Sequence, residues 1–65
     1  MATKAQKSEA KTMINFEIGY LSSGDAWAND TNYIIGLMKG CLVSGTITAE
    51  EYNGFLKELY PFKTL

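Results

Sequence analysis

The fold of this chain is decided by the stretch Ser44-Gly45-Thr46-Ile47-Thr48-Ala49-Glu50-Glu51-Tyr52. Gly45 can take the positive φ angle that closes a preceding helix. Thr48 and Glu51 have the spacing of a capping box, and Ile47 and Tyr52 have the spacing of the hydrophobic staple that surrounds such a box. The stretch therefore predicts the end of one helix and the start of the next, within a few residues.

Downstream of this corner, a conventional amphipathic helix is expected from Ala49 to Tyr60. One stripe is apolar, formed by Tyr52, Phe55, Leu56 and Leu59. The opposite side is polar, with Glu50, Asn53, Lys57 and Glu58. Pro61 ends the helix and begins a tail, residues 61–65, whose Phe62 and Leu65 are apolar enough to dock on the bundle or on another chain.

Upstream of the corner, a second helix runs to Ser44, and its start is left open between Asp25 and the pair Asp30 and Thr31, since each can cap a helix. Apolar residues cover more than half of its circumference: Tyr33, Ile34, Ile35, Leu37, Met38, Cys41, Leu42 and Val43. Such a helix must be covered from at least two sides. We expect it to be the central helix, a self-association surface, or both.

The narrow polar face of this second helix carries two glycines, Gly36 and Gly40, beside Asn32 and Lys39. Their spacing permits close contact between helices, a rule established for membrane helices. The alternative is that the glycines only weaken a helix held by its packing.

A first helix is expected from Thr3 to Leu21, with a weak capping box between Thr3 and Gln6 and little to hold residues 1–7, which we expect to fray. Ser22-Ser23-Gly24-Asp25 is the clearest break in the chain. The sequence thus predicts one all-α domain over residues 1–65, a three-helix bundle.

The amino-acid composition excludes several classes of function. The chain has 65 residues, no His and no Arg, and its only cysteine is Cys41. Serine and cysteine triads cannot be built without His, and the ligands for zinc or calcium are missing. We predict no metal, no cofactor and no enzymatic activity, with Cys41 in the core. A lone domain of this size is marginally stable, so we expect a homodimer or higher oligomer.

We expect the protein to lie in the cytoplasm. No apolar run approaches the roughly 18 residues of a membrane span. The first residues lack the apolar core of a signal peptide.

The candidate contact residues are polar side chains that fall on an apolar face and apolar side chains that the expected fold leaves exposed. Glu17 falls inside the apolar arc of the first helix, where we expect it to pair with a tyrosine hydroxyl or a lysine, from this chain or another subunit, or else the arc to be exposed there; a ligand or catalytic role is the weaker alternative. Trp27 either covers the open end of the core, the favoured interpretation, or anchors a partner. The predicted interaction surface comprises Glu17, Tyr20, Trp27, Tyr33, Ile35 and Val43.

The main functional prediction is a protein that binds itself and another, unidentified protein. The alternative is a nucleic-acid-associated regulator that uses Lys4, Lys7 and Lys11 on one face of the first helix. With a net charge of −1 and no Arg, the chain is a poor candidate for phosphate binding. Nucleic acid is therefore the less expected partner.

The phrase Gly45-Thr46-Ile47-Thr48-Ala49-Glu50-Glu51-Tyr52, followed by Leu56 and Leu59, resembles the G-x-I-T-x-E-E-[FY] phrase of short bacterial helical domains such as the SHOCT family. The resemblance covers about a quarter of the chain and implies no particular activity. In its small size, acidity and lack of cofactor motifs, the chain is also similar to accessory proteins of phages and mobile elements, which bind host or regulatory proteins.

Overall fold

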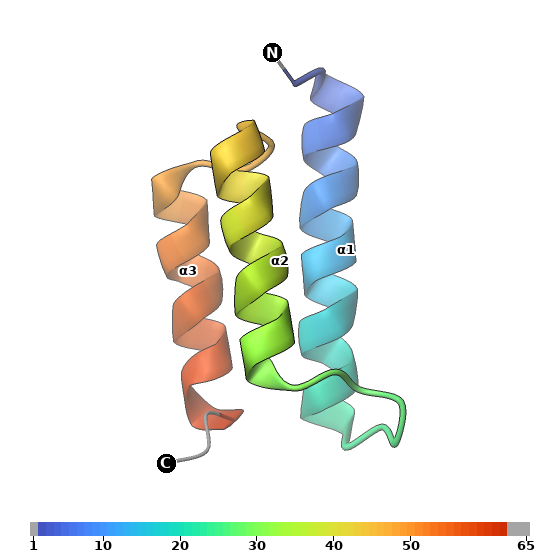
Figure 1. Cartoon of the computed structure of the whole chain (residues 1–65). Helices are drawn as coiled ribbons and strands as arrows, with labels where there is room; N and C mark the ends of the chain where they lie inside the picture. The colour runs from blue at the N-terminus through green and yellow to red at the C-terminus, as the bar shows by residue number, and fades with distance from the viewer. Residues whose placement is uncertain (1, 63–65) are drawn as a thin grey trace.

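The computed structural model describes residues 2–62, which form three α-helices and no strand. The helices are α1 (Lys4–Ser23), α2 (Thr31–Ser44) and α3 (Ala49–Leu59), followed by a short 3-10 turn, η1 (Tyr60–Phe62). In Figure 1, α2 lies between α1 and α3, and consecutive helices run antiparallel. The predicted all-α, three-helix fold is confirmed. The predicted docking of Leu65 lies outside the described residues.

The first helix begins at its predicted cap. The Thr3 hydroxyl accepts a hydrogen bond from the Gln6 N–H at 3.1 Å, and the Gln6 side chain accepts one from the Thr3 N–H at 2.8 Å. The helix continues two residues past Leu21, because the left-handed residue that ends it is Gly24, with φ of 71°. Serine can occupy a last helical turn, so the break falls at the glycine.

The start of α2, which the sequence left open, is at Thr31. Asp30 is the cap, and its carboxylate accepts a hydrogen bond from the Tyr33 N–H at 2.7 Å. Asp25 has a different role, since its carboxylate accepts from the Trp27 N–H at 2.8 Å and so closes a turn within the loop.

The corner between α2 and α3 has the predicted geometry. Gly45 has φ of 80°, and the capping box joins Thr48 to Glu51 through bonds of 3.1 and 2.8 Å. Ile47 is buried and Tyr52 packs against the core. The helix ends one residue earlier than predicted, at Leu59, because Pro61 has no N–H to continue the α-helical pattern and the chain tightens into η1.

The core is built from all three helices and the corner. Its buried apolar side chains are Ala10, Ile14, Ile18, Ile34, Met38, Cys41, Ile47, Phe55 and Leu59. Four of them are fully buried, namely Ile14, Ile34, Met38 and Leu59. Truncating such a residue to Ala costs about 2–5 kcal/mol, which is a large part of the stability of a small domain. The prediction that Cys41 packs in the core is confirmed.

Candidate interaction surface

A stripe of exposed apolar side chains runs along α1. Met13, Phe16 and Tyr20 are spaced by three and four residues, so they lie on one side of the helix. They remain 45%, 62% and 43% exposed. The stripe lies beside the buried positions Ala10 and Ile14, so α1 presents apolar side chains to solvent as well as to the core.

A second exposed stripe lies on α2. Tyr33, Gly36, Gly40 and Val43 follow a helical spacing of three, four and three residues, which places them on one side. Tyr33 is 55% exposed and Val43 is 88% exposed. The solvent-facing side of α2 is therefore wider and more apolar than the predicted polar face of Asn32, Gly36, Lys39 and Gly40.

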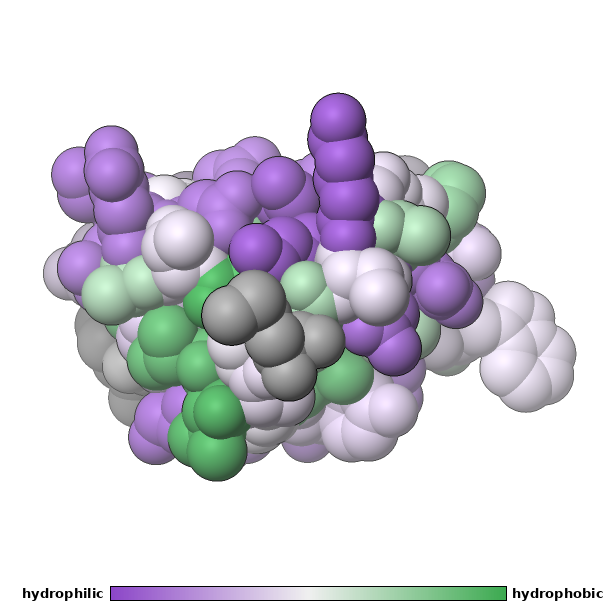
Figure 2. Space-filling model, turned by 90° about the horizontal axis from the view of Figure 1, so that it is seen from above, coloured by the Kyte–Doolittle hydropathy of each residue, from purple (hydrophilic) through white to green (hydrophobic). Residues whose placement is uncertain are grey.

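The two stripes meet at a groove of about 370 Å³ between α1 and α2, which is lined by Met13 of one stripe and Gly40 of the other. Because α1 and α2 run antiparallel (Figure 1), Tyr20 and Tyr33 lie nearer the loop end of the two helices than Met13 and Gly40 do. We call the combined surface the aromatic face; its residues are Met13, Phe16, Tyr20, Tyr33, Gly36, Gly40 and Val43. Figure 2 shows hydrophilic side chains along the upper edge of the end view and a cluster of hydrophobic side chains at its lower left.

Gly36 and Gly40 have no steric role within the described chain. A Cβ added at either position would meet no described heavy atom within 4 Å. Each glycine in an exposed helix interior costs about 1 kcal/mol relative to Ala. Close packing of these glycines, one of the two sequence interpretations, does not occur within residues 2–62.

Trp27 is 90% exposed, so the predicted lid over the open end of the core is wrong. The turn closed by Asp25 directs the chain so that Ala28 and Asn29, rather than Trp27, are half-buried. The Ala28 N–H also donates to the Asp25 carbonyl at 3.1 Å. The loop thus holds its tryptophan in solvent with local hydrogen bonds.

Glu17 is half-buried, and its partner differs from the prediction. Its carboxylate accepts a hydrogen bond from the side-chain amide of Asn29 at 2.7 Å, not from a tyrosine or a lysine. Glu17 lies four residues after Met13, on the groove side of α1. The bond therefore holds the loop against the helix beside the aromatic face.

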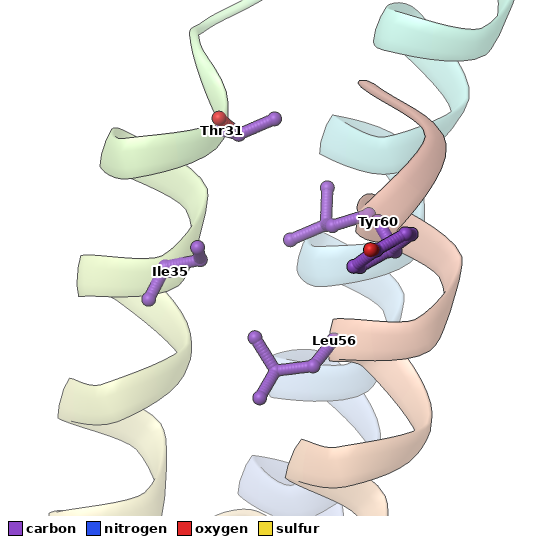
Figure 3. Close-up of a pocket in the computed structure, with 5 residues that line it drawn as sticks. Thr31, Ile35, Leu56 and Tyr60 are labelled. Atoms are coloured by element: carbon purple, nitrogen blue, oxygen red, sulfur yellow. The ribbon is translucent and has the colours of Figure 1, made fainter. Parts of the chain in front are cut away.

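Ile35 does not join this surface. It lies on the other flank of α2 and lines a separate cavity of about 140 Å³ with Thr31, Leu56, Leu59 and Tyr60. Figure 3 shows Thr31 and Ile35 on α2 facing Leu56 and Tyr60 across this cavity. The structure thus brings Tyr20, Tyr33 and Val43 onto the aromatic face, with Glu17 beside it, and places Trp27 on the loop.

Two residues of the aromatic face, Met13 and Phe16, belong to the wide apolar arc of the first helix. Their spacing with Tyr20 is visible in the sequence, but periodicity alone cannot say which part of a wide apolar arc is covered. Val43 was found because the apolar arc of α2 is too wide for the rest of the chain to cover.

The lysine face of α1 is partly used within the fold. Lys4 and Lys7 are exposed, whereas Lys11 Nζ lies 2.9 Å from Glu51 Oε2 on α3. The hydrogen bond from the Thr48 N–H, followed by the Lys11 ammonium, lowers the pKa of Glu51 from its usual value of 4.5. One of the three lysines considered for nucleic-acid contact thus helps to join α1 to α3.

Residues 2–62 contain no cluster of three or more His, Cys, Asp or Glu side chains arranged to hold a metal ion. None of their helices combines the length and apolar character needed to cross a membrane. Comparisons with protein-family models, curated proteins and solved structures gave no match.

Proposed function

We propose that this protein is a non-enzymatic interaction or regulatory protein, which binds another protein through the Trp27 loop and associates with itself through its helical surface. The observation that carries the proposal is Trp27, which is 90% exposed in a loop held by hydrogen bonds. Tryptophan is enriched among the residues that dominate binding energy at protein interfaces. An exposed tryptophan of this kind is suited to insert into a pocket of a partner protein.

The loop is organised before binding. Asp25 fixes the turn at Trp27, Asn29 is held by Glu17, and Asp30 caps α2. Ordering a flexible loop on binding would reduce affinity, so a loop with fixed geometry retains more of the contact energy. The carboxylates of Asp25 and Asp30 flank the tryptophan in sequence, which favours a partner pocket with an apolar floor and a basic rim.

The wider setting that we propose is the cytoplasm, with a role like that of phage or mobile-element accessory proteins, which act by binding host or regulatory proteins. Self-association through α2 and partner binding through the loop would use different parts of the molecule. The nucleic-acid alternative predicts salt-sensitive DNA or RNA binding that is lost when Lys4 and Lys7 are neutralised.

The test places a photo-crosslinking amino acid at position 27 in cells that naturally contain the protein, with position 57 on the polar side of α3 as the control. We expect a covalent adduct with a second protein from position 27 only. With that protein purified, Trp27→Ala should weaken binding at least about tenfold.

The matched control is Tyr60→Ala, because Tyr60 is also an exposed aromatic residue, at 76%. Its binding should match that of the unmodified protein. Equal binding by the Trp27→Ala variant, or equal crosslinking from both positions, would contradict the proposed function.

A further inference from the structure

We propose that the aromatic face is the contact surface of a two-fold homodimer, in which α2 packs parallel to α2 of a second copy across Gly36 and Gly40. The inference rests on the proposed function for its premise that the exposed apolar surface serves protein contacts. It adds to the proposed self-association the face that the second copy covers and the geometry of the contact.

The glycines supply the steric argument. They lie one helical turn apart at the middle of the solvent-facing side of α2, with open space where their side chains would be. Two helices approach most closely where both lack side chains, and the backbones then pack directly. A parallel pair related by a two-fold axis brings each glycine beside its own copy, so one stripe serves both sides of the contact.

The area of the face is sufficient for a dimer. Met13, Phe16, Tyr20 and Tyr33 are each about half exposed. With ~200 Å² for a large side chain, they offer roughly 400 Å² of apolar surface per copy. Interfaces are a little over half apolar, which implies about 700 Å² per copy. Stable interfaces of standard size bury about 600–1,000 Å² per partner, a range that includes this value.

Charge also favours a second copy. The net charge of −1 gives little repulsion between copies. Glu9 lines the groove at one edge of the face, and Lys39 lies at the other edge, beyond Gly36 and Gly40. Neither is in an ion pair within residues 2–62.

A two-fold axis parallel to α2 places Lys39 of each copy on the side where α1 of the other copy carries Glu9. An antiparallel α2 pair centred between the two glycines would instead bring the two Lys39 ammonium groups together. Opposite charges across the contact therefore select the parallel arrangement.

The first test measures sedimentation equilibrium of the full chain and of two variants, Gly40→Lys and Gly54→Lys. Both glycines are exposed and helical with no described atom near their Cβ positions, and lysine is the better helix former at both. We expect a dimer for the unmodified chain and for Gly54→Lys. Gly40→Lys, which puts an ammonium at the centre of the contact, should raise the dimer dissociation constant by roughly a hundredfold or more.

The second test is disulfide trapping with Gly36→Cys, and Gly54→Cys is its control. In the parallel pair the two introduced cysteines lie within the Cα separation that a disulfide requires, about 4.4–6.8 Å. We expect rapid crosslinking at position 36 and none at position 54. The native Cys41 is buried and does not interfere.

A monomer at every concentration, or equal effects of the lysine substitutions at positions 40 and 54, would overturn the homodimer. A dimer without crosslinking at position 36 would overturn the parallel geometry. Photo-crosslinking from position 27 reports on a different surface, so a monomer that still forms an adduct with another protein would refute self-association and leave partner binding through the Trp27 loop in place.

Discussion

Thr48 is the residue at which the importance of the α2–α3 corner can be measured. In the Thr48→Ala variant, the Glu51 N–H loses the side-chain acceptor that lies 3.1 Å away. Replacing a threonine cap by alanine usually costs about 1 kcal/mol. The full cost is expected here, because the preceding residue, Ile47, is only 3% exposed. The start of α3 cannot unwind without drawing Ile47 from the core.

The matched control is Thr3→Ala, which removes the same kind of box at the start of α1. Residues from Thr3 to Glu9 are exposed, and the first buried residue of that helix is Ala10. The first turn of α1 can therefore unwind without exposing the core. We expect a loss of only a few tenths of a kcal/mol, as for caps whose helix end is free to fray.

Thermal and urea unfolding, followed by circular dichroism at one protein concentration, distinguish these outcomes. About 1 kcal/mol corresponds to a decrease in Tm of about 4–8 °C for a domain of this size. Thr48→Ser keeps the acceptor and should retain most of the stability. Equal losses from the Thr3→Ala and Thr48→Ala variants would refute the reasoning that the corner, and not the box alone, sets the cost.

Three other changes have defined outcomes. Gly45→Ala forces a side chain into the left-handed region and should lower the free energy of unfolding by about 1–2 kcal/mol in urea titrations. The lowered pKa of Glu51 stabilises the fold above pH 4.5, and this contribution is lost as the pH falls through the folded pKa; Glu51→Gln should therefore lose less stability between pH 7 and pH 3. Asn29→Ala removes the bond to Glu17 and should cost about 1 kcal/mol, with faster amide exchange in the loop; unchanged exchange would contradict its role.

The corner and the caps could be predicted from the sequence because each is specified by neighbouring residues. Gly45, Thr48 and Glu51 satisfy backbone groups within a few positions of themselves, so no tertiary information is needed. The start of α2 was ambiguous because Asp25 and Asp30 can both cap a helix. Only the three-dimensional path of the loop, held by the bond between Glu17 and Asn29, assigns the cap to Asp30.

The exposed surface was harder to predict, because burial depends on which helices meet. Trp27 was expected to cover the core, yet the turn at Asp25 leaves it in solvent. Phe16 belongs to the apolar arc of α1, yet only one side of that arc is covered and Phe16 is exposed. The excess of apolar circumference on α2 was readable from the sequence, whereas the side of the helix that remains open was not.

Hydroxyl-radical footprinting read by mass spectrometry tests most directly whether another chain covers the aromatic face. Labelling of Met13, Phe16 and Tyr33 should fall as the protein concentration rises through the dimer dissociation constant. Labelling of Tyr60, which lies outside the face, should stay constant. Constant labelling of Met13, Phe16 and Tyr33 at all concentrations would contradict the claim.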